Sequence, residues 1–221
     1  MSSLKSIKAV LFDLDGVIID TESMYMNMMI EYNKKIGIGA GKDYYIKNLL
    51  GKTKDEITKY YLKDFNKDFN EEKYWLDLLK IRQDYINNNQ LNLKIGVFEL
   101  INYLKSNNYL LGIVTSNSLD LTNKLLKNAG LDYKLFNLIL TREDVSKTKP
   151  SPELYEVALK RLNLNKDETI AIEDSKVGIN SALAAGLDVI NVEDIDIVPA
   201  DLKSKCIFVC KDLTEIINYL R

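Results

Sequence analysis

Residues 9–16 read AVLFDLDG: four apolar residues lead into Asp13 and Asp15, and Gly16 follows. In a strand, side chains two positions apart point to the same side, so we expect both carboxylates to emerge close together where the strand ends. Ligands of open parallel sheets bind outside the carboxyl ends of the strands. Two like charges in such a crevice repel each other unless one is protonated or a cation lies between them, and hard oxygen ligands favour Mg²⁺. The segment predicts a cation site at a sheet edge; the alternative is a solvated acidic turn in which Gly16 serves only the turn.

Short apolar and β-branched runs recur along the chain and alternate with helical patterns. By length, composition and flanking turn residues they predict six strands, at residues 8–13, 110–115, 135–141, 169–174, 188–192 and 206–210. A chain that alternates strand and helix forms a parallel sheet covered by helices on both faces. The expected fold is α/β, with a doubly wound, Rossmann-like parallel sheet.

One interval interrupts this alternation. Residues 21–92 contain helical patterns and no convincing strand, and the polar run INNNQLN (86–92) is expected to lead back to the sheet. The prediction is an all-helical cap domain, residues 21–92, inserted into an α/β core formed by residues 1–20 and 93–221.

Composition limits the choice of partners. The 221 residues are 46% hydrophobic and 28% charged, and acidic and basic residues are interspersed to give a formal net charge of −2. Such a chain has no strong field to hold nucleic acid or an anionic membrane, so neither is expected as a partner. No apolar run is long enough to span a bilayer, and residues 1–10 lack the apolar core of a secretory signal. We expect a cytoplasmic protein, monomeric by default.

The chain contains no histidine and two cysteines, Cys206 and Cys210. The lack of histidine removes histidine-based triads, histidine acid–base catalysis and most zinc sites. Cysteines four residues apart in a strand hold their thiols roughly 13 Å apart, so no disulfide between them is expected.

Polar residues also follow other predicted strands. The strand at 110–115 ends on hydroxyl and amide donors ahead of a helix, which suits a phosphate oxygen; these are Thr115, Ser116 and Asn117. The strand at 169–174 ends on Glu173 and Asp174, and Lys149 precedes a helix start, where an anion would satisfy both the lysine and the helix dipole. Each has an ordinary alternative, as a helix cap, surface acids or a solvated lysine. Their coincidence at the strand ends of one sheet favours a single phosphate-binding crevice.

Gly178 lies inside a helical pattern. Glycine there costs about 1 kcal/mol relative to alanine. Two interpretations stay open: a close approach of the backbone at this position, or simple tolerance of the glycine.

Four segments carry these residues: LFDLDGVIIDTE (11–22), GIVTSNS (112–118), KPSPELY (149–155) and IAIEDSKVGINSALAAG (170–186). In order and spacing they resemble the four motifs of the haloacid dehalogenase superfamily, and the resemblance covers the whole chain. The helical insertion resembles the small helical cap of that superfamily. The combination of motifs is specific for the superfamily and much less so for a substrate.

The resemblance implies catalysis through an aspartyl-phosphate. Asp13 would attack phosphorus, and Asp15 would act first as the acid for the leaving alkoxide and then as the base that activates water. Mg²⁺ is the implied cofactor. Its ligands would be the Asp13 carboxylate, the Asp15 backbone carbonyl and Asp174, with Glu173 as an auxiliary ligand.

The resemblance also implies how the phosphoryl group is held. Thr115 and Lys149 would bind the transferring oxygens, Ser116 and Asn117 would add donors, and Gly16 would let the chain turn sharply beside the phosphate. Phosphoryl transfer requires positioning and charge neutralisation above all, so the absence of histidine is no obstacle.

Within the superfamily, the second aspartate separates reaction classes. Dehalogenases and phosphonoacetaldehyde hydrolases lack it, so Asp15 favours phosphate esters. The nearest rival is a sugar-phosphate mutase resembling β-phosphoglucomutase, which carries an arginine in a cap segment similar to LGKTKDE (50–56) and a histidine soon after the first motif. Here Lys54 and Tyr25 stand at the matching positions. Because a lysine cannot grip a second phosphate in bidentate fashion, the prediction is a phosphatase for a small phosphorylated metabolite. Lys54 is the expected substrate-binding residue of the cap, and Lys52 is a further candidate for contact with an anionic group of the substrate. The alternative is that both are solvated lysines at a helix start.

A further alternative is a non-catalytic protein that binds a phosphorylated ligand on the same scaffold. It is disfavoured because Asp13, Asp15, Lys149 and Asp174 all fit the catalytic motifs. The substrate stays open among phosphoglycolate, sugar and polyol phosphates, and modified-nucleoside monophosphates.

Overall fold

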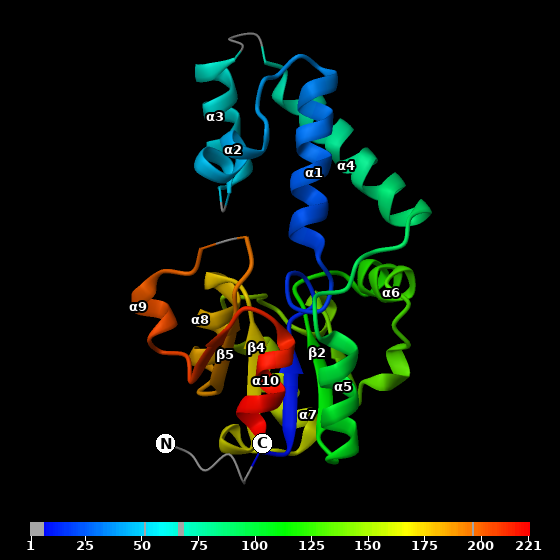
Figure 1. Ribbon diagram of the computed structural model, residues 1–221, viewed down its shortest axis with the longest axis vertical. Helices are drawn as coiled ribbons and strands as arrows, with labels where there is room; N and C mark the ends of the chain where they lie inside the picture. The colour runs from blue at the N-terminus through cyan, green and yellow to red at the C-terminus, as the bar shows by residue number, and fades with distance from the viewer. Residues whose placement is uncertain (1–6, 51, 66–68, 196) are drawn as a thin grey trace. The chain divides into compact units, whose positions relative to one another are not determined.

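A computed structural model describes residues 7–50, 52–65, 69–195 and 197–221 of the chain (Figure 1). Its contacts divide the chain into two compact units. The helical unit is Thr21–Asn89, and the sheet unit combines Met1–Asp20 with Gln90–Arg221. The expected absence of a secretory signal rests on residues 1–10, of which residues 1–6 lie outside the described part. None of the helices in the described ranges is long and apolar enough to cross a membrane.

The sheet unit contains six parallel strands in the order β3-β2-β1-β4-β5-β6. Their bounds are β1 (Ala9–Phe12), β2 (Leu110–Val114), β3 (Leu138–Leu140), β4 (Thr169–Glu173), β5 (Asp188–Val192) and β6 (Phe208–Cys210). All six predicted strands are present, and the predicted doubly wound α/β fold is confirmed. The strands expected at 135–141 and 206–210 are shorter than predicted, since they form the two edges, where a strand has one neighbour to pair with and is commonly short.

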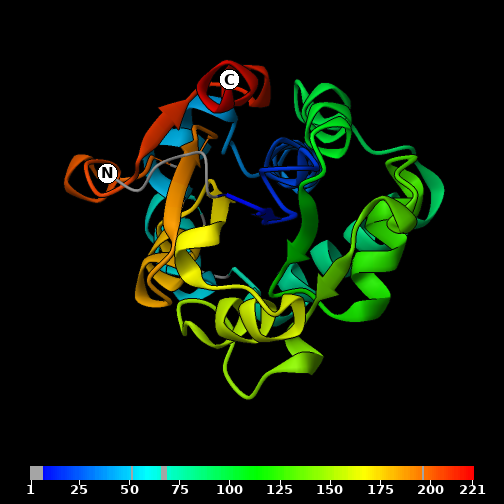
Figure 2. The same cartoon turned by 90° about the horizontal axis from the view of Figure 1, so that it is seen from below.

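Helices cover both faces of this sheet (Figures 1 and 2). They are α5 (Val97–Ser106), α6 (Leu119–Asn128), α7 (Glu153–Leu162), α8 (Lys176–Ala184), α9 (Ala200–Lys203) and α10 (Leu213–Leu220), with short 3₁₀ turns at Tyr133–Leu135, Arg142–Asp144 and Lys166–Glu168. Helix α5 packs beside α10, and α7 packs beside α8. All four residues of β1 are buried, as expected for a central strand covered on both sides.

The helical unit consists of α1 (Thr21–Lys35), α2 (Lys42–Tyr44), a π-helical turn at Tyr45–Leu49, α3 (Lys54–Asp64) and α4 (Glu71–Asn88). Its described residues form helices and loops and no strand. The segment expected to be a linker, 86–92, begins later than predicted because α4 continues to Asn88. Side-chain amides of Asn88 and Asn89 donate to the carbonyls of Asp84 and Tyr85 and complete the last turn.

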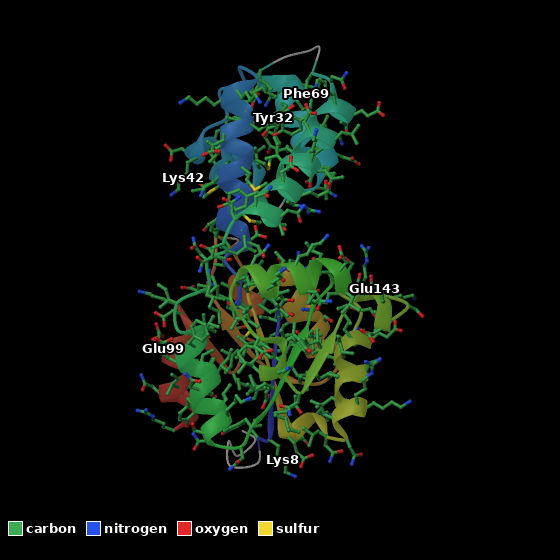
Figure 3. The ribbon with its side chains drawn as sticks, turned by 90° about the vertical axis from the view of Figure 1, so that its right-hand side faces the viewer. Lys8, Tyr32, Lys42, Phe69, Glu99 and Glu143 are labelled. Atoms are coloured by element: carbon green, nitrogen blue, oxygen red, sulfur yellow. The ribbon has the colours of Figure 1, made fainter. Side chains whose placement is uncertain are left out.

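A polar cluster holds the helical unit together. Asn33 is fully buried in α1, where its amide donates to the Tyr61 hydroxyl of α3 at 2.9 Å and accepts from the Tyr74 hydroxyl of α4 at 2.8 Å. The rings of Tyr32 and Phe69, labelled in Figure 3, pack on Tyr74 with centroids 5.4 and 5.0 Å away. Because the buried amide is paired on both sides, this cluster fixes how α1, α3 and α4 pack.

No disulfide joins the two cysteines, as predicted, but only Cys210 belongs to a strand, because β6 begins at Phe208. Cys206 and Cys210 are both free thiols, and Cys210 is buried at the end of β6. Burial raises the pKa of the Cys210 thiol to about 12, so it behaves as a small apolar side chain.

Candidate active site

The strand order brings the carboxyl ends of the central strands to one edge of the sheet, where a ligand crevice is expected. Strand β1 lies between β2 and β4, and Phe12 pairs with Ile113 on one side and Ile172 on the other. The next residue of each strand is at this edge: Asp13, Val114 and Glu173. The chain runs outward in both directions from β1, and a point where the strand order reverses is where doubly wound proteins bind ligands.

Lys149 joins these three strand ends. Its Nζ donates to the Asp13 Oδ1 at 2.5 Å, to the Val114 carbonyl at 2.7 Å and to the Glu173 Oε1 at 2.7 Å. An ammonium group has three protons, so all three are used. Burial alone would lower the pKa of Lys149, but the carboxylates of Asp13 and Glu173 outweigh it and raise that pKa above its ordinary value. The lysine is therefore a permanent positive charge in the crevice.

Glu173 is the most deeply buried acid of the site, with no exposed surface. Its Oε1 also accepts from the Tyr155 hydroxyl at 2.5 Å, whereas its Oε2 has no hydrogen-bond partner among the described residues. Burial raises the pKa of this carboxyl, the Asp13 charge adds to the effect, and Lys149 opposes it. A Cβ on Gly178 would lie 1.9 Å from Oε2, so of the two interpretations left open for that glycine the close approach is the one that the structure shows.

Gly16 makes a second close approach. Its φ is +76°, in the left-handed region that favours glycine, and a Cβ there would lie 2.0 Å from the Asp174 Oδ2. The sequence predicted a sharp turn at this position. The structure adds that the backbone of Gly16 passes directly over the Asp174 carboxylate.

Asp15 is held by a residue from the next strand end. The Asn117 amide donates to the Asp15 Oδ2 at 2.5 Å, and the Asn117 backbone N–H donates to the Thr115 Oγ1 at 3.1 Å. Thr115 is buried, and Ser116 between them is exposed. Asn117 was expected to donate to phosphate; in the structure its side chain orients the second aspartate.

Most predicted residues of the sheet unit are linked by contacts at these strand ends. One group is Asp13, Gly16, Lys149, Glu173 and Asp174, and the other is Asp15, Thr115 and Asn117. The predicted residue Ser116 lies between Thr115 and Asn117 with its side chain exposed. Lys54 belongs to the helical unit.

The acids of the crevice fit a divalent cation. Asp13, Glu173 and Asp174 each offer a carboxylate oxygen within 4.8 Å of the others. With Asp15 the site holds four carboxylates against the single ammonium of Lys149, and the unpartnered Oε2 of Glu173 is an additional acceptor. Such a set of hard oxygen donors suits Mg²⁺.

Lys54 lines a pocket of about 190 Å³ in the helical unit. The other lining residues are Tyr25, Met28, Met29, Trp75, Leu78, Leu79 and Arg82. The Lys54 Nζ lies 5.4 Å from the Trp75 ring centre, and the Arg82 guanidinium lies 5.6 Å from the Tyr25 ring centre. Within the described part of the chain, no carboxylate pairs with either cation.

Sequence reasoning missed three partners of these sites. Tyr155 carried no signal, because a tyrosine at a helical apolar spacing is ordinary core. Arg82 also carried no signal, because an arginine within a helical pattern is ordinary. The Asp194 Oδ2 lies 2.9 Å from the position that a Cβ on Gly16 would occupy. Asp194 follows β5 by two residues, and applying the strand-end rule to a fourth strand would have found it.

Comparison with known proteins agrees with this geometry. The family model for haloacid dehalogenase-like hydrolases matches residues 10–192, most of the chain. This chain belongs to that family. This haloacid dehalogenase-like hydrolase is similar to a phosphorylated carbohydrates phosphatase of Thermotoga maritima. The two are 28% identical over 193 residues, and the match covers 82% of each chain. This chain is 31% identical over 198 residues to the protein CbbY of Rhodobacter capsulatus, covering 83% of this chain and 84% of the other.

A solved structure shares the fold. It is the crystal structure of a protein described as a HAD family hydrolase, from Deinococcus radiodurans R1, with bound phosphate and sodium. The TM-score is 0.81 at 23% identity, over 96% of this haloacid dehalogenase-like hydrolase and 93% of the other chain.

Proposed function

We propose that this haloacid dehalogenase-like hydrolase is a Mg²⁺-dependent phosphatase, which hydrolyses a small phosphorylated metabolite through a phosphoryl group carried on Asp13. The observation that carries the proposal is the buried ammonium of Lys149, 2.5 Å from the Asp13 Oδ1 and beside Glu173. The contact holds the Asp13 carboxyl group in place at the strand end, where a nucleophile is needed. The phosphatase from Thermotoga maritima to which the chain is similar supports the same reaction class.

The proposed reaction has two steps. An Asp13 oxygen forms a bond to phosphorus while the bond from phosphorus to the ester oxygen breaks, and Asp15 gives its proton to the leaving alkoxide. Asp15, now ionised, takes a proton from water as the water oxygen attacks phosphorus and releases Asp13 and inorganic phosphate. The hydrogen bond from Asn117 keeps the Asp15 carboxyl in place for both transfers.

Charge is the main obstacle in this crevice, where a phosphate ester meets the carboxyl groups of four acids. Lys149 supplies one positive charge, and Thr115, which follows the Val114 carbonyl that accepts from Lys149, adds a buried hydroxyl. Asp13, Asp174 and the Asp15 carbonyl would hold Mg²⁺, with Glu173 beside them; the cation neutralises charge on the phosphoryl oxygens when bound.

Phosphate release from a panel of small phosphomonoesters tests the proposal. We expect turnover with Mg²⁺, loss of turnover with excess chelator, and recovery when Mg²⁺ is returned. β-Glucose 1-phosphate is assayed separately for glucose 6-phosphate, because isomerisation with little free phosphate would make the protein a mutase. Binding of phosphorylated ligands without turnover would make it a non-catalytic binding protein.

Lys54 enters the proposal as a substrate-binding residue together with Arg82. Two cations that lie over aromatic rings, without a carboxylate partner among the described residues, suit an anionic group carried on an apolar body. The methionines of the pocket can adapt to that body. Lys54→Gln and Arg82→Gln are each expected to raise KM by about 10-fold, the value of one hydrogen bond to a charged group, with a smaller change in kcat.

Lys52→Gln is the matched control for Lys54. It removes the same charge two residues away, where the lysine pairs with Glu56 at 3.6 Å instead of lining the pocket. An equal rise in KM for Lys52→Gln and Lys54→Gln would show a general charge effect and would remove Lys54 from the substrate site.

A further inference from the structure

Asp194 is a buried carboxylate that the reaction above leaves without a role. It lies two residues beyond β5, and its side chain is 4% exposed. Its Oδ1 accepts from the Lys94 Nζ at 2.7 Å, whereas its Oδ2 is buried without a hydrogen-bond partner among the described residues. Lys94 offsets the charge of Asp194 but leaves half of the carboxylate unsatisfied, which is rare in a protein interior.

The unsatisfied oxygen faces the proposed cation site. It lies 2.9 Å from the position that a Cβ on Gly16 would occupy, and the Asp174 Oδ2 lies 2.0 Å from that same point. The two carboxylate oxygens are thus within about 5 Å of each other, close enough for like charges to act on one another. Because Gly16 has no Cβ, the carboxylates of Asp174 and Asp194 can both approach its backbone and lie close to each other.

Direct coordination is not required for an acid in this position to act on a cation. Mg²⁺ gives up its waters reluctantly and keeps several of them in protein sites. Those waters donate hydrogen bonds, and an oxygen with no donor in the protein is a suitable acceptor for one. Residues that orient a metal's ligands in this way change metal affinity by 10–100-fold when they are replaced.

Lys94 connects this acid to the segments that join the two units. Its backbone N–H donates to the Ile18 carbonyl at 2.9 Å, and the Asp20 N–H donates to the Asn92 carbonyl at 2.9 Å. Ile19 and Leu93 form an antiparallel bridge between these two contacts. The paired segments therefore fix Lys94, and Lys94 in turn fixes the Asp194 carboxylate.

We propose that Asp194 is a positioning residue of the cation site: oriented by Lys94, its Oδ2 accepts a hydrogen bond from a water molecule on the divalent cation held by Asp13 and Asp174. This inference rests on the proposed function only for the presence of that cation. It assigns Asp194 no contact with the reacting phosphoryl group.

Binding of Mn²⁺, followed by the electron paramagnetic resonance signal of the free ion, tests the inference without turnover. Asp194→Asn keeps the size of the side chain and an acceptor for Lys94, and replaces the outer carboxylate oxygen. We expect Mn²⁺ affinity to fall about 10-fold. In phosphate release, the Mg²⁺ concentration for half-maximal activation should rise by a similar factor, while KM for the phosphomonoester and kcat at saturating Mg²⁺ stay near the values of the original protein.

Glu193→Gln is the matched control. It removes the same charge from the preceding residue, whose carboxylate is exposed and pairs with Lys203. We expect its Mn²⁺ affinity to stay unchanged. A loss equal to that of Asp194→Asn would overturn the inference, since it would reflect net charge alone.

The remaining outcomes separate the inference from the function. Unchanged Mn²⁺ affinity in Asp194→Asn overturns the role of Asp194 and leaves the phosphatase proposal intact. An original protein that binds no Mn²⁺ overturns the cation site itself. If Asp194→Asn fails to fold, as judged by thermal unfolding without metal, the smaller Asp194→Ser replaces it, with the same loss of Mn²⁺ affinity expected.

Discussion

Asp13→Asn is expected to reduce phosphate release by at least about 10³-fold, because an amide cannot serve as the nucleophile that the proposed reaction requires. The substitution preserves shape and keeps an oxygen to accept from Lys149, whose other two acceptors are the Val114 carbonyl and Glu173. The fold should therefore survive. The measurement is kcat on the best substrate of the panel, together with the thermal unfolding midpoint.

Ligand binding supplies the control for this prediction. The asparagine variant should still bind inorganic phosphate in the presence of Mg²⁺, because Thr115 and Lys149 are unaltered. Turnover that persists in a correctly folded variant would mean that another group attacks phosphorus.

Gly16→Ala is expected to lower activity by at least about 100-fold, about the cost of misplacing a reacting group by 1 Å. Its φ of +76° costs alanine about 1–2 kcal/mol in folding. The new Cβ would also lie 2.0 Å from the Asp174 Oδ2, so either the carboxylate or the loop must move. Both belong to the proposed cation site, so activity should fall by far more than stability explains. The measurements are kcat, the Mg²⁺ activation constant and the free energy of unfolding.

Gly130→Ala separates the two causes. Gly130 follows α6 with a φ of +70°, and a Cβ there would meet nothing within 4 Å. Alanine at this position has the same unfavourable backbone conformation but no steric clash. The free energy of unfolding should therefore fall by a similar amount, while kcat is retained. A similar loss of activity in both variants would show that Gly16 serves only the turn.

The sheet and much of the crevice follow from local sequence rules. Strands separated by helical patterns predict a parallel sheet, and carboxyl ends of parallel strands share one edge, so Asp13 and Glu173 were expected together. The shortness of β3 and β6 could not be predicted, because it depends on which strands lie at the edges. The strand order is set by packing of the helices, and it cannot be predicted from the strand residues themselves.

Contacts between distant segments are the part that sequence patterns do not predict. The Val114 carbonyl accepts from Lys149 only because β1, β2 and β4 are in one particular register. Lys94 and Asp194 are 100 residues apart, and neither has a pattern that points to the other. In the helical unit, apolar spacing predicts burial of Tyr74 but gives no sign of its hydrogen bond to Asn33.

The three-way contact of Lys149 also bears on how much the site must rearrange in each turnover. Of its three acceptors, only Asp13 changes chemically in the proposed reaction, while the Val114 carbonyl belongs to the rigid backbone of a central strand and Glu173 has no exposed surface. The ammonium thus has two anchors that stay fixed as the phosphoryl group arrives and leaves. Its field is already oriented before the ester binds, so little reorganisation energy is added to the barrier.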